Sequence, residues 1–181
     1  MRKIVWTFGI IAGVVCGGIF YLDIPQEGEA MNFDSGQAWG YLTMIIALST
    51  IFFAVWQYRK NFCKGKINFG KSFLIGFYIT LIASVIYVIG WEIFYQNFAS
   101  DFGDQYMAWQ RESMTEQGMN ASEIDQILAP QEETMDLYAN NAAFRWAMTF
   151  LEIFPVGLII SLLVATIFGV FLNKKAQVKV S

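Results

Sequence analysis

Long apolar runs alternate with shorter polar segments along this chain. Residues 73–95 read FLIGFYITLIASVIYVIGWEIFY and hold a single charged residue, Glu92. Because an α-helix rises about 1.5 Å per residue, such a run covers the roughly 30 Å of a bilayer's hydrocarbon core. The same pattern recurs along the chain and predicts four transmembrane helices, at about 4–22, 38–56, 73–95 and 147–172.

The longest polar segment, residues 96–143, separates the third and fourth predicted spans. An aromatic stripe at spacings of four and three begins at Phe102 and predicts a helix that ends near Gly118. Ser122 is expected to cap a second helix, and Pro130 to open a third at its first turn. The predicted product is an extracytoplasmic helical hairpin folded against the end of the bundle.

Composition supports the membrane assignment and narrows the chemistry. The 181 residues are 56% hydrophobic and 15% charged, which is too apolar for a soluble domain. We therefore expect one all-α polytopic membrane domain over residues 1–181. The chain has no histidine, so it lacks His-ligated metal sites and serine–histidine triads. Without histidine, and without paired acids at metal or glycosidase spacing, we expect no enzyme and no cofactor. The net charge of -3 predicts no nucleic-acid partner.

The basic residues are segregated from the acidic ones. Ten of the 12 Lys and Arg residues lie at the two termini and in the loop between the second and third spans, where no acid occurs: Arg2, Lys3, Arg59, Lys60, Lys64, Lys66, Lys71, Lys174, Lys175 and Lys179. Basic residues near span ends favour the cytoplasmic side. The charges therefore predict both termini in the cytoplasm and residues 96–143 on the opposite side.

Glycines line one face of the first predicted span. Gly9, Gly13 and Gly17 fall four residues apart, and small residues at this spacing let two helix backbones approach closely in lipid. Two interpretations stay open, of which the first is preferred. The face packs against another helix of the same chain, or it mediates self-dimerisation.

Two carboxylates, Glu92 and Glu152, lie inside apolar runs, and each is followed by Ile-Phe. Lys71 precedes Glu92 by 21 residues, and Lys174 follows Glu152 by 22, so both acids are expected roughly 32 Å above the cytoplasmic anchors. At one level they could face each other. Arg145, seven residues before Glu152 and on the same helical face, is the expected counter-charge.

This candidate intramembrane polar site has two interpretations. In the functional one it binds a proton or cation at the mouth of the bundle, and Pro155 bends the fourth span beside it. In the structural one, which is preferred, partners such as Trp91, Arg145, a tyrosine hydroxyl or a helix N-terminus satisfy each glutamate.

Three segments carry a resemblance to a known family. They are INFGKSF at 67–73, IYVIGWEIFYQ at 86–96 and MTFLEIFPVGLIISL at 148–162. They resemble recurrent segments of the bacterial domain of unknown function 4199 family. The resemblance covers nearly the whole chain and implies a four-helix integral protein of the bacterial inner membrane, without an established activity.

Two function classes follow from these observations. The first, which is preferred, is a structural or interaction protein whose partners are the lipid bilayer and a second copy or another membrane protein. The alternative is a small oligomeric transporter or channel for protons or cations that uses Glu92 and Glu152. An oligomer is required there because four spans leave little room for a pathway in a monomer.

Overall fold

The computed structural model describes residues 1–22, 24 and 31–172, and this part of the chain is helical, without a strand. Its elements are α1 (Arg2–Gly18), η1 (Ile19–Tyr21), α2 (Phe33–Leu48), α3 (Thr50–Phe62), α4 (Phe69–Phe98), α5 (Phe102–Glu116), α6 (Ala121–Asn140), α7 (Ala142–Thr166) and η2 (Ile167–Phe171). Lys174, Lys175 and Lys179, on which part of the predicted orientation rests, lie outside the described residues.

Four helical stretches are long and apolar enough to cross a membrane, which confirms the predicted number. They are Arg2–Tyr21, Gly36–Phe62, Phe69–Phe98 and Ala142–Phe171. Each stretch starts before its predicted first residue, since polar residues at a helix end are invisible to an apolar-run criterion. The third stretch, for example, starts earlier because Asn68 caps α4, its Oδ1 accepting a hydrogen bond from the backbone N–H of Lys71 at 2.8 Å.

The second span is divided into two helices, α2 and α3, which meet at Ser49. The Ser49 hydroxyl donates to the carbonyl of Ile45 at 2.6 Å, and the Thr50 hydroxyl donates to the carbonyl of Ala47 at 2.6 Å. Hydroxyls that bond back to the preceding turn compete with the helical hydrogen bonds and often bend a helix. The break therefore lies where two such residues follow one another.

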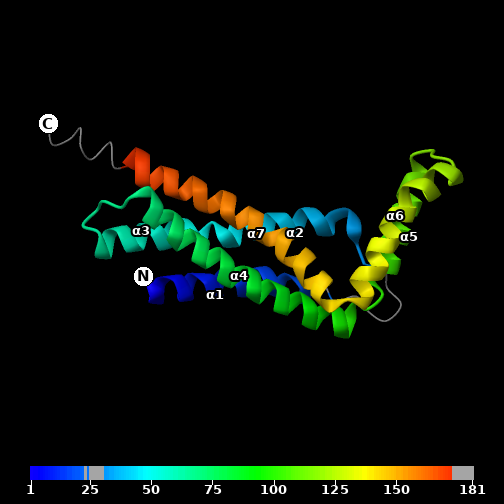
Figure 1. The fold of residues 1–181 in the computed structure, drawn as a ribbon, viewed down its shortest axis with the longest axis horizontal. Coiled ribbons are helices and arrows are strands. Elements are labelled where there is room, and N and C mark those ends of the chain that lie inside the picture. Colours follow the sequence, from blue (N-terminus) through cyan, green and yellow to red (C-terminus); the bar gives the residue numbers. More distant parts are fainter. Residues whose placement is uncertain (23, 25–30, 173–181) are drawn as a thin grey trace.

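Helix α4 is central in the bundle, with α1 along one side and α7 along another (Figure 1). A Cβ added at Gly9 or Gly13 would lie 2.9 Å or 2.7 Å from the Cβ of Ile82 or Ile86 on α4. The glycine face of α1 thus packs against α4 of the same chain. At Gly17 the approach is looser, with the Ile86 carbonyl oxygen 3.6 Å from such a Cβ.

The interface between α4 and α7 also depends on small residues. A Cβ at Gly157 would overlap the Thr80 side chain, and the Thr80 and Ser161 hydroxyls are 3.4 Å apart. Near the other end, a Cβ at Gly169 would overlap the backbone of Phe69. These close approaches fix the relative level of α4 and α7 along the bundle.

Helices α5 and α6 form a hairpin, which projects at an angle from one end of the bundle (Figure 1). Two details of the prediction are wrong. Asn120, rather than Ser122, caps α6 in a capping box with Glu123, and Pro130 lies inside α6 rather than starting a third helix. A continuous helix accommodates Pro130 because this part of α6 is exposed and water can satisfy the carbonyl freed by the missing N–H.

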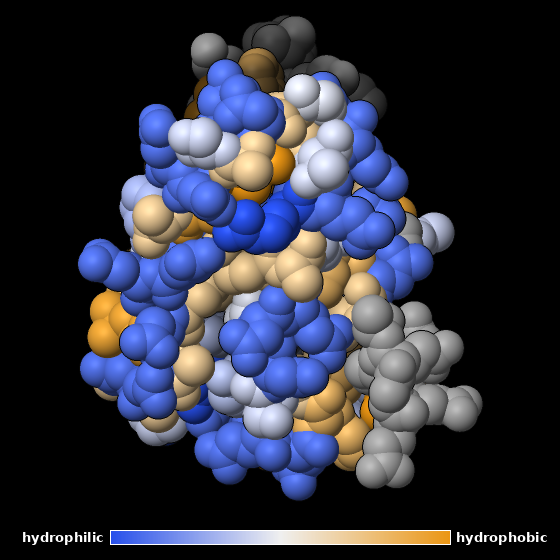
Figure 2. Space-filling model, turned by 90° about the vertical axis from the view of Figure 1, so that its right-hand side faces the viewer, coloured by the Kyte–Doolittle hydropathy of each residue, from blue (hydrophilic) through white to orange (hydrophobic). Residues whose placement is uncertain are grey.

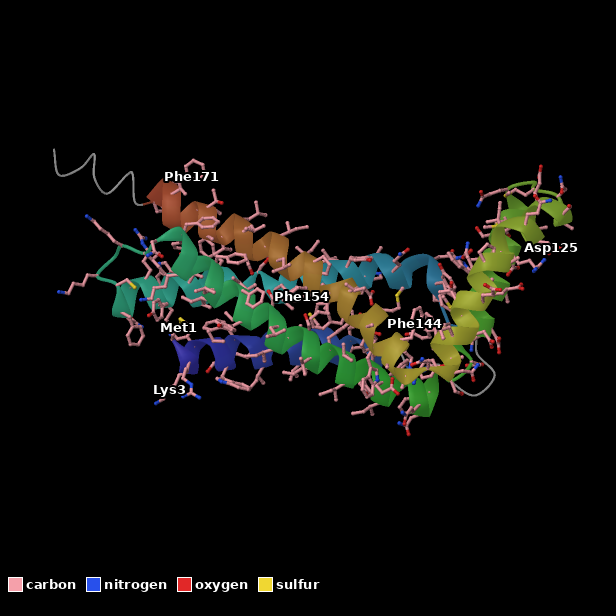
Figure 3. All side chains as sticks on the ribbon, viewed as in Figure 1. Met1, Lys3, Asp125, Phe144, Phe154 and Phe171 are labelled. Carbon is pink, nitrogen blue, oxygen red and sulfur yellow. The ribbon has the colours of Figure 1, made fainter. Side chains whose placement is uncertain are left out.

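The hairpin end and the opposite, basic end of the bundle differ in charge. Figure 3 shows Lys3 beside the start of α1 and Asp125 on the hairpin, at opposite ends of the molecule. Viewed from the hairpin end, hydrophilic residues cover much of the surface, with apolar side chains between them (Figure 2). Broad apolar surfaces lie on the sides of the bundle, including Trp6, Ile46 and Leu151. This distribution fits helices surrounded by lipid.

Candidate functional site

Arg145, near the start of α7, binds Glu92 of α4 in a bidentate ion pair. Its Nε donates to Glu92 Oε2 and its Nη2 to Glu92 Oε1, both at 2.8 Å. The two side chains are 6% and 13% exposed. Asn141 caps α7 by accepting from the N–H of Phe144, which starts the helix early enough to place Arg145 in its first turn. A two-bond pair fixes both distance and orientation between α4 and α7.

The third guanidinium nitrogen of Arg145, Nη1, bonds to the end of α6. Its Nη1 donates to the carbonyls of Tyr138 and Ala139 at 2.7 Å and 3.2 Å. The last carbonyls of a helix lack partners within that helix, and a cation there also complements the helix dipole. The guanidinium carbon lies 4.1 Å from the centre of the Tyr95 ring, within range of a cation–π contact. Arg145 therefore joins α4, α6 and α7, and we call this arrangement the Arg145 clamp.

Aromatic side chains surround the Arg145 clamp. Trp91 Nε1 donates to the Tyr138 hydroxyl at 2.5 Å, so Trp91 does not act as the glutamate partner that the sequence suggested. Phe102 of α5 packs edge-on against Trp91, with ring centres 5.3 Å apart. Burial also raises the pKa of the Tyr138 hydroxyl, to about 12. The hairpin is thereby packed as well as hydrogen-bonded to the bundle.

Glu152 has different surroundings from those predicted. Its Oε2 accepts a hydrogen bond from the Tyr87 hydroxyl of α4 at 3.2 Å, and the residue is exposed on the bundle surface within the fourth span. Arg145 binds Glu92 instead, so the expected pairing of Arg145 with Glu152 is wrong. A carboxylate within a span is costly unless water, a cation, a proton or a partner compensates it.

The two acids also lie at different levels along the bundle, which the expected equal depth did not allow for. Gly169 of η2 touches Phe69 at the start of α4, so these two residues share a level. Counting from them, Glu92 is 23 residues along α4 whereas Glu152 is 17 residues along α7. The difference of six residues places Glu92 about 9 Å nearer the hairpin.

Pro155 lies inside α7, which runs without interruption over Ala142–Thr166. A discontinuous helix beside Glu152 is therefore absent from the described part of the fourth span. The irregular turn occurs near the basic end instead, where Ile167–Phe171 forms the π-helix η2. No described residues form a group of three or more potential metal-ligating side chains of the Cys, Asp and Glu types.

Sequence reasoning missed several residues at this site. Gln96 Nε2 donates to Glu92 Oε1 at 2.8 Å, and its spacing of four residues on the same helix was a usable signal. Tyr87, Tyr95 and Tyr138 gave no such signal. Their roles depend on contacts between helices, which spacing along one helix does not report.

The family model described as "Protein of unknown function (DUF4199)" matches residues 7–169. This match covers all four candidate spans in whole or in large part, together with the hairpin. The chain belongs to the DUF4199 family. No curated protein and no solved structure matches it. The DUF4199 assignment agrees with four apolar helices, and what the polar site does has to be argued from its geometry.

The geometry separates the two carboxylates chemically. Glu92 uses both oxygens in the pair with Arg145 and accepts a further bond from Gln96, so its charge is compensated and its contacts are fixed. Glu152 has a single hydrogen bond in the described structure and an exposed side. The first arrangement can hold helices together, and the second can exchange a proton or meet a ligand.

Proposed function

We propose that this DUF4199 protein is a structural or interaction protein of the bacterial inner membrane, with both termini in the cytoplasm. In this proposal the hairpin α5–α6 is held at a defined angle outside the membrane and presented to a partner. The observation that carries it is the Arg145 clamp, because a single side chain joins the end of the hairpin to two spans.

Contacts at the base of the hairpin support the same view. Trp109 Nε1 of α5 donates to Asp34 at the start of α2 at 3.1 Å, and Gln105 Oε1 accepts from the N–H of Met31 at 2.8 Å. The Phe33 ring lies 5.7 Å from that of Phe102. These contacts, together with the Arg145 clamp, tie the hairpin to the beginning of the second span as well as to α4 and α7.

The proposal is tested by photocrosslinking in native membranes. A photoreactive amino acid at Ile127 or Leu137, which are 41% and 45% exposed on α6, should give a discrete crosslinked species. The same group at Val14, which is 57% exposed on α1 among lipid-facing residues, is the control and should not give that species. The Glu92→Gln variant should weaken the hairpin crosslink while the protein remains in the membrane.

Two outcomes would overturn the proposal. One is the absence of any crosslink from the hairpin in a protein that is monomeric in the membrane. The other is a hairpin crosslink that is unchanged when Glu92 is replaced, because the Arg145 clamp would then have no bearing on presentation.

A second candidate is a small oligomeric transporter or channel for protons or cations. The supporting observation is Glu152, whose carboxylate lies within a span and has one hydrogen bond among the described residues, from Tyr87. Glu92 contributes less to this candidate because Arg145 already occupies both of its oxygens. In liposomes, Glu152→Gln should abolish a pH-dependent cation or proton flux, and normal flux in that variant would exclude the candidate.

A further inference from the structure

An apolar groove of about 350 Å³ lies near the basic end of the bundle, between α3 and the π-helix η2. Its lining is mainly aromatic, and one basic residue belongs to it: Phe52, Phe53, Trp56, Arg59, Phe168 and Leu172. The groove is far from the Arg145 clamp and plays no part in the function proposed above. It lies on stretches that qualify as membrane spans, so hydrocarbon chains would surround it.

The geometry of η2 creates one wall of the groove. Over Ile167–Phe171 the helix widens into a π-helix. This form is rare in proteins, and where it occurs it often lies at a functional site. In this turn Phe168 is buried, with its ring 4.9 Å from that of Phe52. Gly169 lies against the backbone of Phe69, so η2 is held in place from behind. The wall is therefore a fixed part of the fold.

Arg59 supplies the polar end of the groove. Its Nε is buried and has no hydrogen-bond partner among the described residues, while its guanidinium carbon is 5.8 Å from the centre of the Phe168 ring. A buried donor without a partner is costly, and a charged one more so. Arg59 as a whole is half-buried and lines the groove, so its uncompensated positive charge there is best satisfied by a negatively charged acceptor.

The charge around Arg59 favours an anion. Residues 59–71 contain five basic residues and no acid: Arg59, Lys60, Lys64, Lys66 and Lys71. The Lys60 ammonium lies 5.4 Å from the centre of the Trp56 ring, and Trp56 lines the groove. A second cation is thus positioned beside the same opening. Basic clusters directly next to a span are typical of sites for anionic lipid headgroups.

We propose that this groove binds one anionic phospholipid from the leaflet at the basic end of the bundle. The phosphate accepts hydrogen bonds from Arg59 with Lys60 beside it, and one acyl chain lies along Phe53, Trp56 and Phe168. A second copy of the chain fits less well, because the opening needs an anion whereas the surrounding segment 59–71 carries only bases. A phospholipid joins the two required chemistries, an anion and a hydrocarbon chain, in one molecule.

Native mass spectrometry of the full-length protein in detergent tests the proposal. The probes are dioleoyl phosphatidylglycerol, dioleoyl phosphatidylcholine and glycerol 3-phosphate, which separate charge, hydrocarbon chain and phosphate. We expect phosphatidylglycerol to bind at least tenfold more tightly than either of the other two. Equal binding of phosphatidylcholine, or equally tight binding of glycerol 3-phosphate, would overturn the proposal, since it requires both the anion and the chain.

Variants then locate the site. Arg59→Gln should weaken phosphatidylglycerol binding about tenfold, as expected when a direct charged hydrogen bond is lost. Lys64→Gln is the matched control, because it removes the same charge from an exposed residue that does not line the groove, and it should cost at most twofold. Equal losses in both variants would mean diffuse attraction to the basic loop and would overturn the site.

A third variant keeps the test decisive if Arg59→Gln disturbs folding. Phe53 is 58% exposed, so Phe53→Ala leaves every charge and most of the packing unchanged. It should still weaken phosphatidylglycerol binding, by about fivefold, because the acyl chain loses part of its wall. Unchanged binding in a folded Phe53→Ala protein would show that the chain does not lie in this groove.

Discussion

The protein uses the same residue types in two contrasting environments. Gly13 is enclosed by α4, whereas a Cβ at Gly40 of α2 would meet no described atom within 4 Å. Glu92 is held by Arg145, whereas Glu152 is exposed with one hydrogen bond. The contrast teaches that a motif in a membrane span has no fixed meaning. The role of such a motif depends on whether the chain itself supplies its partner, which is a neighbouring helix for a glycine face and a counter-charge for a glutamate.

Removal of the clamp residue should have the largest effect. Arg145→Ala leaves the largely buried Glu92 side chain without its counter-charge and frees the last carbonyls of α6. We expect the free energy of unfolding to fall by about 3 kcal/mol, toward the lower end of the range for buried pairs because the site is near the end of the span. A titration with sodium dodecyl sulfate in mixed micelles measures it.

The matched control for that prediction is Arg111→Ala. Arg111 also bonds an acid, Asp125, at 2.7 Å, but both side chains are well exposed on the hairpin. Its loss should therefore be much smaller than that of Arg145. Similar losses in the two variants would contradict the contrast between enclosed and exposed ion pairs.

The contrast between Gly13 and Gly40 provides the next test. Gly13→Leu places a side chain where the Ile86 Cβ is 2.7 Å from the first new atom, so we expect a loss of about 1–3 kcal/mol from overpacking. Gly40→Leu has space and replaces a poor helix former, so it should change stability little or raise it by up to about 1 kcal/mol. Thermal unfolding followed by circular dichroism compares them. A larger loss at Gly40 would mean that α2 packs there in the membrane.

The glutamates should differ in stability as well. Glu152→Gln keeps an oxygen that can accept from the Tyr87 hydroxyl, so the free energy of unfolding should change by about 0.5 kcal/mol or less. Glu92→Gln breaks the ion pair and should cost several times more. The same detergent titration ranks the two variants, and the reverse order would assign the structural role to Glu152.

The last expected effect is confined to alkaline pH and is absent at neutral pH. The pKa of Tyr138 is raised to about 12 in the folded protein, compared with about 10 in an unfolded chain. A raised pKa stabilises the folded state below the unfolded value, and this stabilisation is lost as the pH rises from about 10 to about 12. Tyr138→Phe should flatten the fall of the unfolding temperature in that range. An unchanged slope would show that Tyr138 is not buried beside the Arg145 clamp.

Much of the fold could be predicted from local sequence signals. The four spans and the hairpin follow from apolar length and helical spacing, which each segment carries by itself. The helix ends were less predictable. Ser122 and Asn120 are both good capping residues, and only the reciprocal bond with Glu123 decides between them. The fit of Pro130 inside α6 depends on its exposed surroundings, which the spacing of residues does not show.

The candidate site was only partly predictable. Glu92, Glu152 and Arg145 stand out because charges are rare in apolar runs, and that signal is local. Their pairing is not local. The contact between Gly169 and Phe69 sets the register of α4 against α7, and this register brings Arg145 to Glu92 and leaves Glu152 to Tyr87.

The sequence by itself determined that the chain is a helical protein with four spans, because the cost of placing backbone and charge in lipid is a property of each segment alone. Only the tertiary structure decided which glycine face is filled, which glutamate is neutralised and which arginine keeps an open hydrogen-bonding position. These outcomes depend on distances between helices of a few ångströms. Side chains from remote parts of the chain set those distances, and no single segment encodes them.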